Sequence, residues 1–133
     1  MLDAQKISIA TFEGSALRVT TTVDFDFVEG PAWIDEGTVV VIGTHEGRRG
    51  LWQLDVSSGN RVFVNIKGFN LFGDVSVSPS RGELAFCAVQ VGIDETRYAL
   101  WRYSLRDKSM HRLAASIDPY HPAPWWGPQI VEK

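Results

Sequence analysis

The stretch from Phe27 to Val64, FVEGPAWIDEGTVVVIGTHEGRRGLWQLDVSSGNRVFV, decides the fold class of this chain. Short apolar runs rich in Val, Ile, Leu and Trp alternate there with clusters of Gly, Asp, Glu, Ser and Asn, which favour turns. This pattern predicts a four-stranded antiparallel unit. Its strands are expected at Pro31–Ile34, Thr38–Gly43, Gly50–Asp55 and Arg61–Val64.

The same order of runs returns between Asp74 and Leu113. A short strand, a turn at Ser78–Gly82, a long apolar strand and the run LWRYSL follow one another, and Leu100-Trp101 takes the place of Leu51-Trp52. Internal repeats of roughly 40–50 residues with four strands each are typical of β-propeller blades. A β-sandwich of unrelated hairpins is the alternative, because it is also built from short strands and turns.

Both ends of the chain carry partial copies of this unit. With the strands of a blade lettered a to d, residues 6–22 predict strands c and d, and residues 121–133 predict strands a and b. Residues 27–66 and 74–114 predict complete blades. The fold expected is therefore all-β, with about three propeller blades per chain and one blade split between the termini.

A split blade leaves two sheet edges without partners, which soluble proteins avoid. A homodimer resolves this, because the a-b half-blade of one copy can pair with the c-d half-blade of the other and close a six-bladed ring. The residues expected at this dimer seam are Ile7, Ile9, Trp125 and Trp126. The rival explanation is that the chain is a fragment of a longer propeller.

Composition narrows the function classes. The 133 residues carry a net charge of −3, so no large basic surface for nucleic acid is expected. No apolar run is long enough to span a membrane. The first residues lack the apolar core of a signal peptide and one cysteine allows no internal disulfide, which together favour the cytoplasm. The single cysteine, Cys87, lies in the apolar run Leu84–Val89 and is expected to be a core residue rather than a nucleophile.

Two resemblances support the propeller prediction. The segment VSVSPSRGELAF at Val75–Phe86, followed by LWRYSL, resembles the repeat of TolB-like propellers. Glu29-Gly30-Pro31-Ala32-Trp33 is similar to the E-G-P-x-W opening of the gluconolactonase and senescence-marker-protein family. The second resemblance implies a six-bladed propeller with lactonase activity, in which Glu29 would be a ligand of a divalent metal ion.

Candidate site residues come from the connections that converge on one face of a propeller, around its channel. Carboxylates and histidines can hold a metal ion, and aromatic side chains beside polar groups can form a protein-binding hot spot. Trp33, Trp52, Trp101 and Trp125 recur at corresponding places and are expected in the core. The predicted binding residues are Asp26, Glu29, His45, Arg49, Phe69, Asn70, Phe72, Asp74, Tyr120 and His121.

Two functions follow from these residues. No nucleophile motif, phosphate loop or paired carboxylates can be identified, which favours a non-enzymatic binding module, an adaptor or an inhibitor of a partner protein, without a cofactor. The alternative is a metal-dependent hydrolase of the gluconolactonase type, with calcium or another divalent metal held by Glu29.

Overall fold

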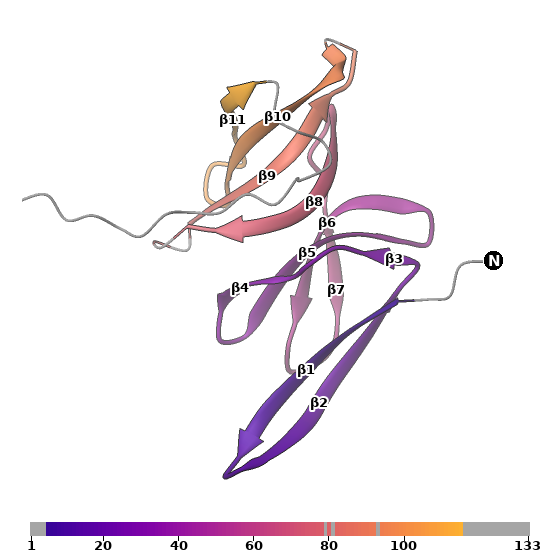
Figure 1. Ribbon diagram of the computed structural model, residues 1–133, viewed down its shortest axis with the longest axis vertical. Helices are drawn as coiled ribbons and strands as arrows, with labels where there is room; N and C mark the ends of the chain where they lie inside the picture. The colour runs from indigo at the N-terminus through magenta and orange to yellow at the C-terminus, as the bar shows by residue number, and fades with distance from the viewer. Residues whose placement is uncertain (1–4, 79, 81, 93, 116–133) are drawn as a thin grey trace, which may run out of the picture. The chain divides into compact units, whose positions relative to one another are not determined.

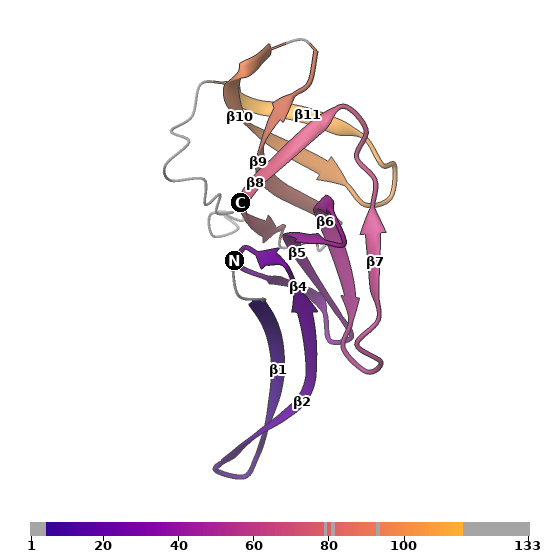
Figure 2. The ribbon, with the colours of Figure 1, turned by 90° about the vertical axis from the view of Figure 1, so that its right-hand side faces the viewer.

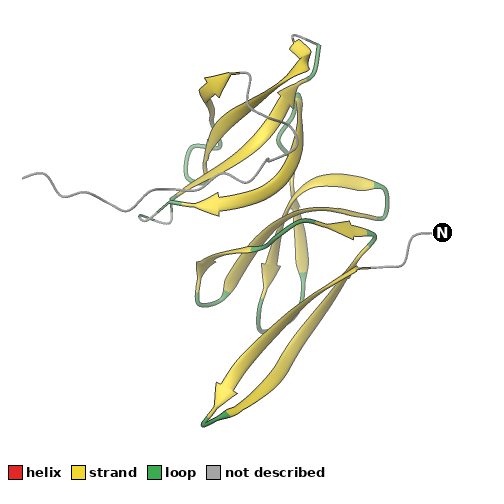
Figure 3. Cartoon of the chain, in the orientation of Figure 1, coloured by secondary structure: helices red, strands yellow, loops and turns green. Residues whose placement is uncertain are grey.

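The computed structural model of the protein describes residues 5–115, except 79, 81 and 93 (Figure 1). All regular structure in this part of the chain is β-strand, so the prediction of an all-β fold is confirmed (Figure 3). None of these residues forms a helix that could cross a membrane. The chain divides into two compact units, residues 1–67 and 68–133, which we call the first and the second unit.

The strands of the first unit form a two-stranded sheet and a five-stranded sheet. The two-stranded sheet is an antiparallel hairpin of β1 and β2, and the order in the larger sheet is β3-β5-β6-β7, with β4 also paired to β5. The strands are β1 (Gln5–Glu13), β2 (Ala16–Phe25), β3 (Phe27–Val28), β4 (Ala32–Asp35), β5 (Thr38–His45), β6 (Arg48–Asp55) and β7 (Arg61–Val64).

The outer strand of the larger sheet is broken in two. Phe27 of β3 lies opposite Thr44, and Trp33 of β4 lies opposite Val39, so both strands pair with β5 on the side that β6 leaves open. The break contains Pro31, which has no N–H to donate and is tolerated at a sheet edge. The four-stranded unit predicted from this stretch is present, with its first strand interrupted.

Strand β5 is buried on both faces because it reads Val-Val-Val-Ile without a polar interruption. Side chains alternate along a strand, so Val39 and Val41 point to one face and Val40 and Ile42 point to the other. All four are almost inaccessible to solvent. Such β-branched runs favour strands that are covered on both sides.

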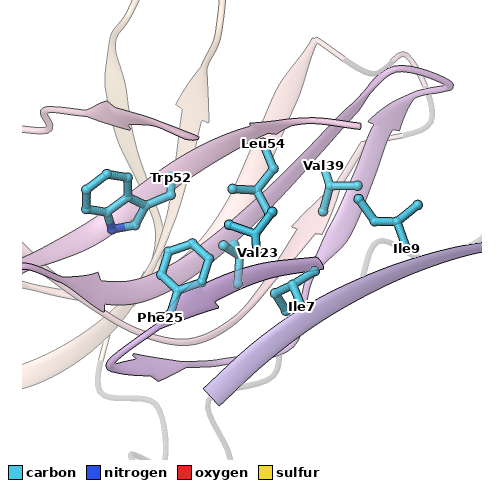
Figure 4. Close-up of a cluster of buried hydrophobic side chains, with 8 residues drawn as sticks. Ile7, Ile9, Val23, Phe25, Val39, Trp52 and Leu54 are labelled. Atoms are coloured by element: carbon cyan, nitrogen blue, oxygen red, sulfur yellow. The ribbon is translucent and has the colours of Figure 1, made fainter. Parts of the chain in front are cut away.

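The hydrophobic core of the first unit lies between the β1–β2 hairpin and one face of β5 and β6 (Figure 4). The indole N–H of Trp52 donates to the carbonyl of Gly43, at 3.1 Å, so this large ring is buried with its polar atom satisfied. Each large apolar side chain buried here contributes about 1.5–3 kcal/mol. The core side chains are Ile7, Ile9, Val23, Phe25, Val39, Val41, Trp52 and Leu54.

The hairpin extends beyond this core (Figure 2). Its ladder runs out to Glu13 opposite Ala16, whereas the β6–β7 ladder ends at Leu54 opposite Arg61. Ile9, the last core residue of β1, pairs with Thr21, and the ladder continues past this pair to the turn.

A β-bulge between Ile9 and Ala10 divides the hairpin into two halves. Thr20 is the extra residue of the bulge, and its hydroxyl donates to the Ile9 carbonyl at 3.2 Å. An extra residue in one strand exchanges the faces to which the following side chains of that strand point. Ile7 and Ile9 face the core, and ordinary alternation along β1 points Phe12 to the other face. The extra residue in β2 turns Leu17 to that same face, opposite Phe12.

The second unit is a four-stranded antiparallel sheet in the sequential order β11-β10-β9-β8. Strand β9 reads Leu-Ala-Phe-Cys-Ala-Val at its centre and is buried on both faces, as expected for the run that contains Cys87. The strands are β8 (Phe69–Val77), β9 (Glu83–Gln90), β10 (Asp94–Ser104) and β11 (Met110–Ala115).

The tryptophans do not all follow the prediction that they lie in the core. Trp52 is buried and Trp101 is half-buried. Trp33 is 52% exposed, so the prediction of a core position is wrong for Trp33. Trp33 lies on the short strand β4 at the edge of the sheet, where β5 is its only neighbour among the described strands. Trp125 lies outside the described residues.

Candidate interaction site

The β5–β6 turn brings three of the predicted binding residues close together. Glu46 and Gly47 form this two-residue turn, and both have positive φ, 52° and 79°. Such turns match the twist of a hairpin, but they favour Asn or Gly over Glu at the first position. Asp26 offsets part of the cost of the positive φ at Glu46, because its Oδ2 accepts the backbone N–H of Glu46 at 3.1 Å. Asp26 therefore has a structural role at this turn.

His45 ends β5 directly before the turn and lies half-buried among aromatic rings. Its imidazole contacts the rings of Phe25 and Trp52 edge to face, with centroid distances of 6.1 and 5.6 Å. Its Nε2 is 3.8 Å from the carboxylate of Glu46. The ring is held by packing on one side and reaches an exposed carboxylate on the other, which suits a hydrogen-bonding contact at a protein surface.

Arginines stack on phenylalanine rings in the first unit. The guanidinium of Arg49 lies 5.7 Å from the ring centre of Phe27, and that of Arg48 lies 4.8 Å from the ring centre of Phe63. Stacking of this kind holds the long side chains in place while the charge stays accessible. Arg48 lies opposite His45 and shares its face of the sheet, whereas Arg49 lies opposite Thr44 and points to the other face, so the two oriented cations lie on opposite sides of the turn.

Glu29 lies in the break between β3 and β4, and its backbone still belongs to the sheet. Its N–H donates to the Ile42 carbonyl at 2.8 Å, which continues the ladder of β3. Within the described residues, no group of three or more His, Cys, Asp or Glu side chains is placed so that it could hold a metal ion. Glu29 is half-buried there, and it belongs to no such group of His, Cys, Asp or Glu side chains among the described residues.

The predicted residues of the second unit lie in a strand rather than in a connection. The sequence placed Phe69, Asn70 and Phe72 in a loop before Asp74, but β8 begins at Phe69 and includes all four. Alternation along this strand turns Phe69 and Phe72 to opposite faces of the sheet. A loop was expected because two glycines flank this run, and pairing with the apolar strand β9 outweighs them.

Each of these two rings packs on an aromatic ring of β10. Phe69 contacts Trp101 at 4.6 Å between ring centres, and Phe72 contacts Tyr98 at 5.2 Å. Edge-to-face contacts of this kind contribute about 0.5–1.5 kcal/mol beyond the area that they bury. Phe69 and Phe72 therefore stabilise the sheet, and they do not form one binding patch.

A surface that the sequence did not reveal lies at the tip of the β1–β2 hairpin. Phe12, Leu17 and Val19 are 77%, 63% and 57% exposed and share the face that points away from the core. We call these three residues, together with Ala10 opposite Val19, the hairpin-tip surface. The bulge that sets the direction of Leu17 and Val19 has no clear sequence signal.

The remaining predictions concern the dimer seam and the end of the chain. Ile7 and Ile9 are buried against β5 and β6 of their own chain. Tyr120, His121, Trp125 and Trp126 lie outside the described residues.

Comparison with known proteins identifies no relative. No protein-family model, no curated protein and no solved structure matches the chain.

Proposed function

We propose that the protein is a non-enzymatic binding module built from TolB-like propeller blades, and that two copies close a six-bladed ring. The topology of the sheets supports this proposal. The larger sheet of the first unit and the sheet of the second unit both run sequentially and antiparallel, as the strands of a blade do. The β1–β2 hairpin packs on a face of the first of them, as part of a neighbouring blade would.

The main support for the homodimer is that one edge of β1 has no partner strand among the described strands. Strand β6 has β5 and β7 beside it and β10 has β9 and β11, whereas β1 has only β2 among the described strands. A two-stranded hairpin is only marginally stable alone, and a free edge is a template for a further strand. In the proposed dimer, residues 121–133 of a second copy supply the two missing strands.

The partner-binding face of the module is the surface around the β5–β6 turn. His45 and Arg48 lie on one face of the hairpin beside the turn, and Arg49 lies on the other face. Aromatic and arginine side chains are enriched at the centres of protein interfaces, so a partner that contacts the turn could engage both faces. The oriented cations favour a partner with carboxylates at the contact. An adaptor or inhibitor role is consistent with such a surface.

Sedimentation equilibrium tests the assembly. We expect a species of twice the 14.8 kDa chain mass that dissociates on dilution. A folded monomer at all concentrations would overturn the closed ring.

Affinity capture tests the binding face. Partners recovered with the wild-type protein should be lost with His45→Ala/Arg49→Ala and retained with Lys108→Ala, a change at an exposed turn of the second unit. Equal recovery with all three proteins would contradict the proposed face.

A further inference from the structure

His45 and Arg48 lie opposite each other on either side of the β5–β6 turn, on the face of the sheet that carries the core of the first unit. Gly43 and Gly50 form the next pair on this face. The ring of Phe63 lies over Gly50, because a Cβ added to Gly50 would be 2.9 Å from Phe63 Cε1. The lack of a side chain at Gly50 therefore leaves room for an aromatic ring next to Arg48.

Aromatic rings hold both basic side chains in place. The guanidinium of Arg48 lies 4.8 Å from the ring centre of Phe63, and the ring centres of His45 and Trp52 are 5.6 Å apart. Phe63 and Trp52 contact each other at 5.0 Å between ring centres, and Trp52 packs on Phe25 (Figure 4). Because these contacts restrict both basic side chains before a ligand arrives, little conformational entropy is lost when they bind one.

A carboxylate of the chain itself already lies beside this pair. The carboxylate of Glu46 is 3.8 Å from Nε2 of His45, and the Glu46 side chain is 82% exposed. A planar guanidinium such as that of Arg48 can donate two parallel hydrogen bonds to a carboxylate. One guanidinium and one imidazole suit the single charge of a carboxylate better than the larger charge and the three acceptor oxygens of a phosphate group.

We infer that His45 and Arg48 bind one carboxylate of the protein partner, and that Glu46 competes with the partner for His45. Glu46 occupies the site from within the chain, so a partner that binds replaces the Glu46 carboxylate with its own. The turn holds Glu46 at a φ of 52°, where Asn or Gly is favoured, and local strain of this kind is common at binding sites. This inference rests on the proposed function and names the chemical group that the partner contributes.

Nuclear magnetic resonance of the isotope-labelled, full-length protein tests where a carboxylate binds. The probe is an acetylated and amidated tetrapeptide with two central glutamates between glycines. It should shift the backbone amide signal of His45 and the side-chain Nε–H signal of Arg48, whereas the same peptide with glutamines should shift neither. Equal shifts at Arg49, which points to the other face, would overturn the site. No shift at tens of millimolar peptide would overturn it as well.

Substitution of Glu46 tests the competition. Glu46→Gln should lower the dissociation constant of the glutamate peptide about twofold to fivefold, the effect of one surface ion pair. Glu36→Gln is the matched control, because it removes the same charge at an exposed position before β5 and should change the constant less. Equal changes for the two variants would show that only the net charge matters and would overturn the competition.

Substitution of the arginines tests which face holds the carboxylate. Arg48→Gln should raise the dissociation constant about tenfold, because it removes a charge-assisted bidentate contact. Arg49→Gln removes the same charge from the other face of the sheet and should leave the shift at His45 in place. Equal losses for the two variants would overturn the assignment to the His45 face.

Inorganic phosphate separates the two kinds of anion. At equal ionic strength it should shift the His45 and Arg48 signals less than the glutamate peptide does, and tighter binding of phosphate would overturn the choice of a carboxylate. A captured partner whose affinity does not respond to Glu46→Gln would overturn this inference but keep the proposed function. Peptide binding at His45 and Arg48 in a protein that captures no partner would overturn the proposed function but keep the carboxylate site.

Discussion

The carboxylate of Asp26 accepts the backbone N–H of Glu46, at 3.1 Å from Oδ2, and so ties the start of the larger sheet to its β5–β6 turn. The backbone N–H of Asp26 also donates to the Thr44 carbonyl at 2.9 Å. Glu46 occupies a position of positive φ, which costs free energy for a residue with a side chain. Asp26 offsets that cost by a hydrogen bond, which explains an acidic residue at this place without a metal or a ligand.

Asp26→Ala should lower the free energy of unfolding by about 1 kcal/mol, because it leaves the Glu46 N–H without its acceptor. Asp26→Asn is the matched control, since its side-chain oxygen can still accept, and it should retain most of the stability. Urea denaturation measures both. Equal losses for the two variants would show that the charge rather than the hydrogen bond matters.

Glu46→Asn should stabilise the protein by a few tenths of a kcal/mol, since Asn tolerates positive φ better than Glu does. The thermal midpoint should rise slightly in calorimetry. A fall in the midpoint would mean that the contact of the Glu46 carboxylate with His45 Nε2, at 3.8 Å, outweighs the backbone preference.

Trp52 and Trp101 should respond differently to replacement by Phe. The Trp52 N–H donates to Gly43, whereas the buried Nε1 of Trp101 has no hydrogen-bond partner among the described residues. Trp101→Phe removes an unsatisfied polar atom together with ring area, so its cost should be at least about 1 kcal/mol smaller than that of Trp52→Phe. Equal costs in urea denaturation would imply that Trp101 Nε1 is satisfied in solution.

Gly43→Ala should destabilise the protein by about 1–3 kcal/mol, the usual cost of overpacking. An added Cβ would lie 2.8 Å from the Phe27 carbonyl oxygen, which is backbone and cannot rotate away. Gly37→Ala is the control, because the nearest atom to its Cβ would be 3.7 Å away. A Gly43 variant as stable as the Gly37 variant would contradict the close approach of β3 to β5.

Cys87 should be unreactive in the folded protein. Burial raises the pKa of its thiol from 9.0 to about 11, so almost no thiolate is present near neutral pH. A thiol reagent such as DTNB should modify it at pH 8 only after denaturation. The unfolded chain loses this proton first as pH rises, so stability should be unaffected below pH 9 and should fall towards pH 11. Rapid labelling of the native protein would contradict this burial.

The strands and turns of this protein could be read from local sequence. The runs at Thr38–Gly43 and Arg61–Val64 are strands as expected. Strand periodicity and turn propensity act over a few residues, so the chain itself contains this information. The burial of Cys87 followed from the same reasoning.

Which strands pair, and to which face of a sheet each side chain points, were decided only by the tertiary structure. The bulge beside Ala10 turns Leu17 and Val19 of β2 away from the core, and pairing with β9 places Phe69 and Phe72 in a strand that the sequence assigned to a loop. Asp26 acts on Glu46 across twenty residues, through a contact that no local pattern encodes. Local sequence determines which segments extend and where they turn. Register, bulges and the exposure of Phe12 and Leu17 depend on hydrogen bonds and packing between segments distant along the chain.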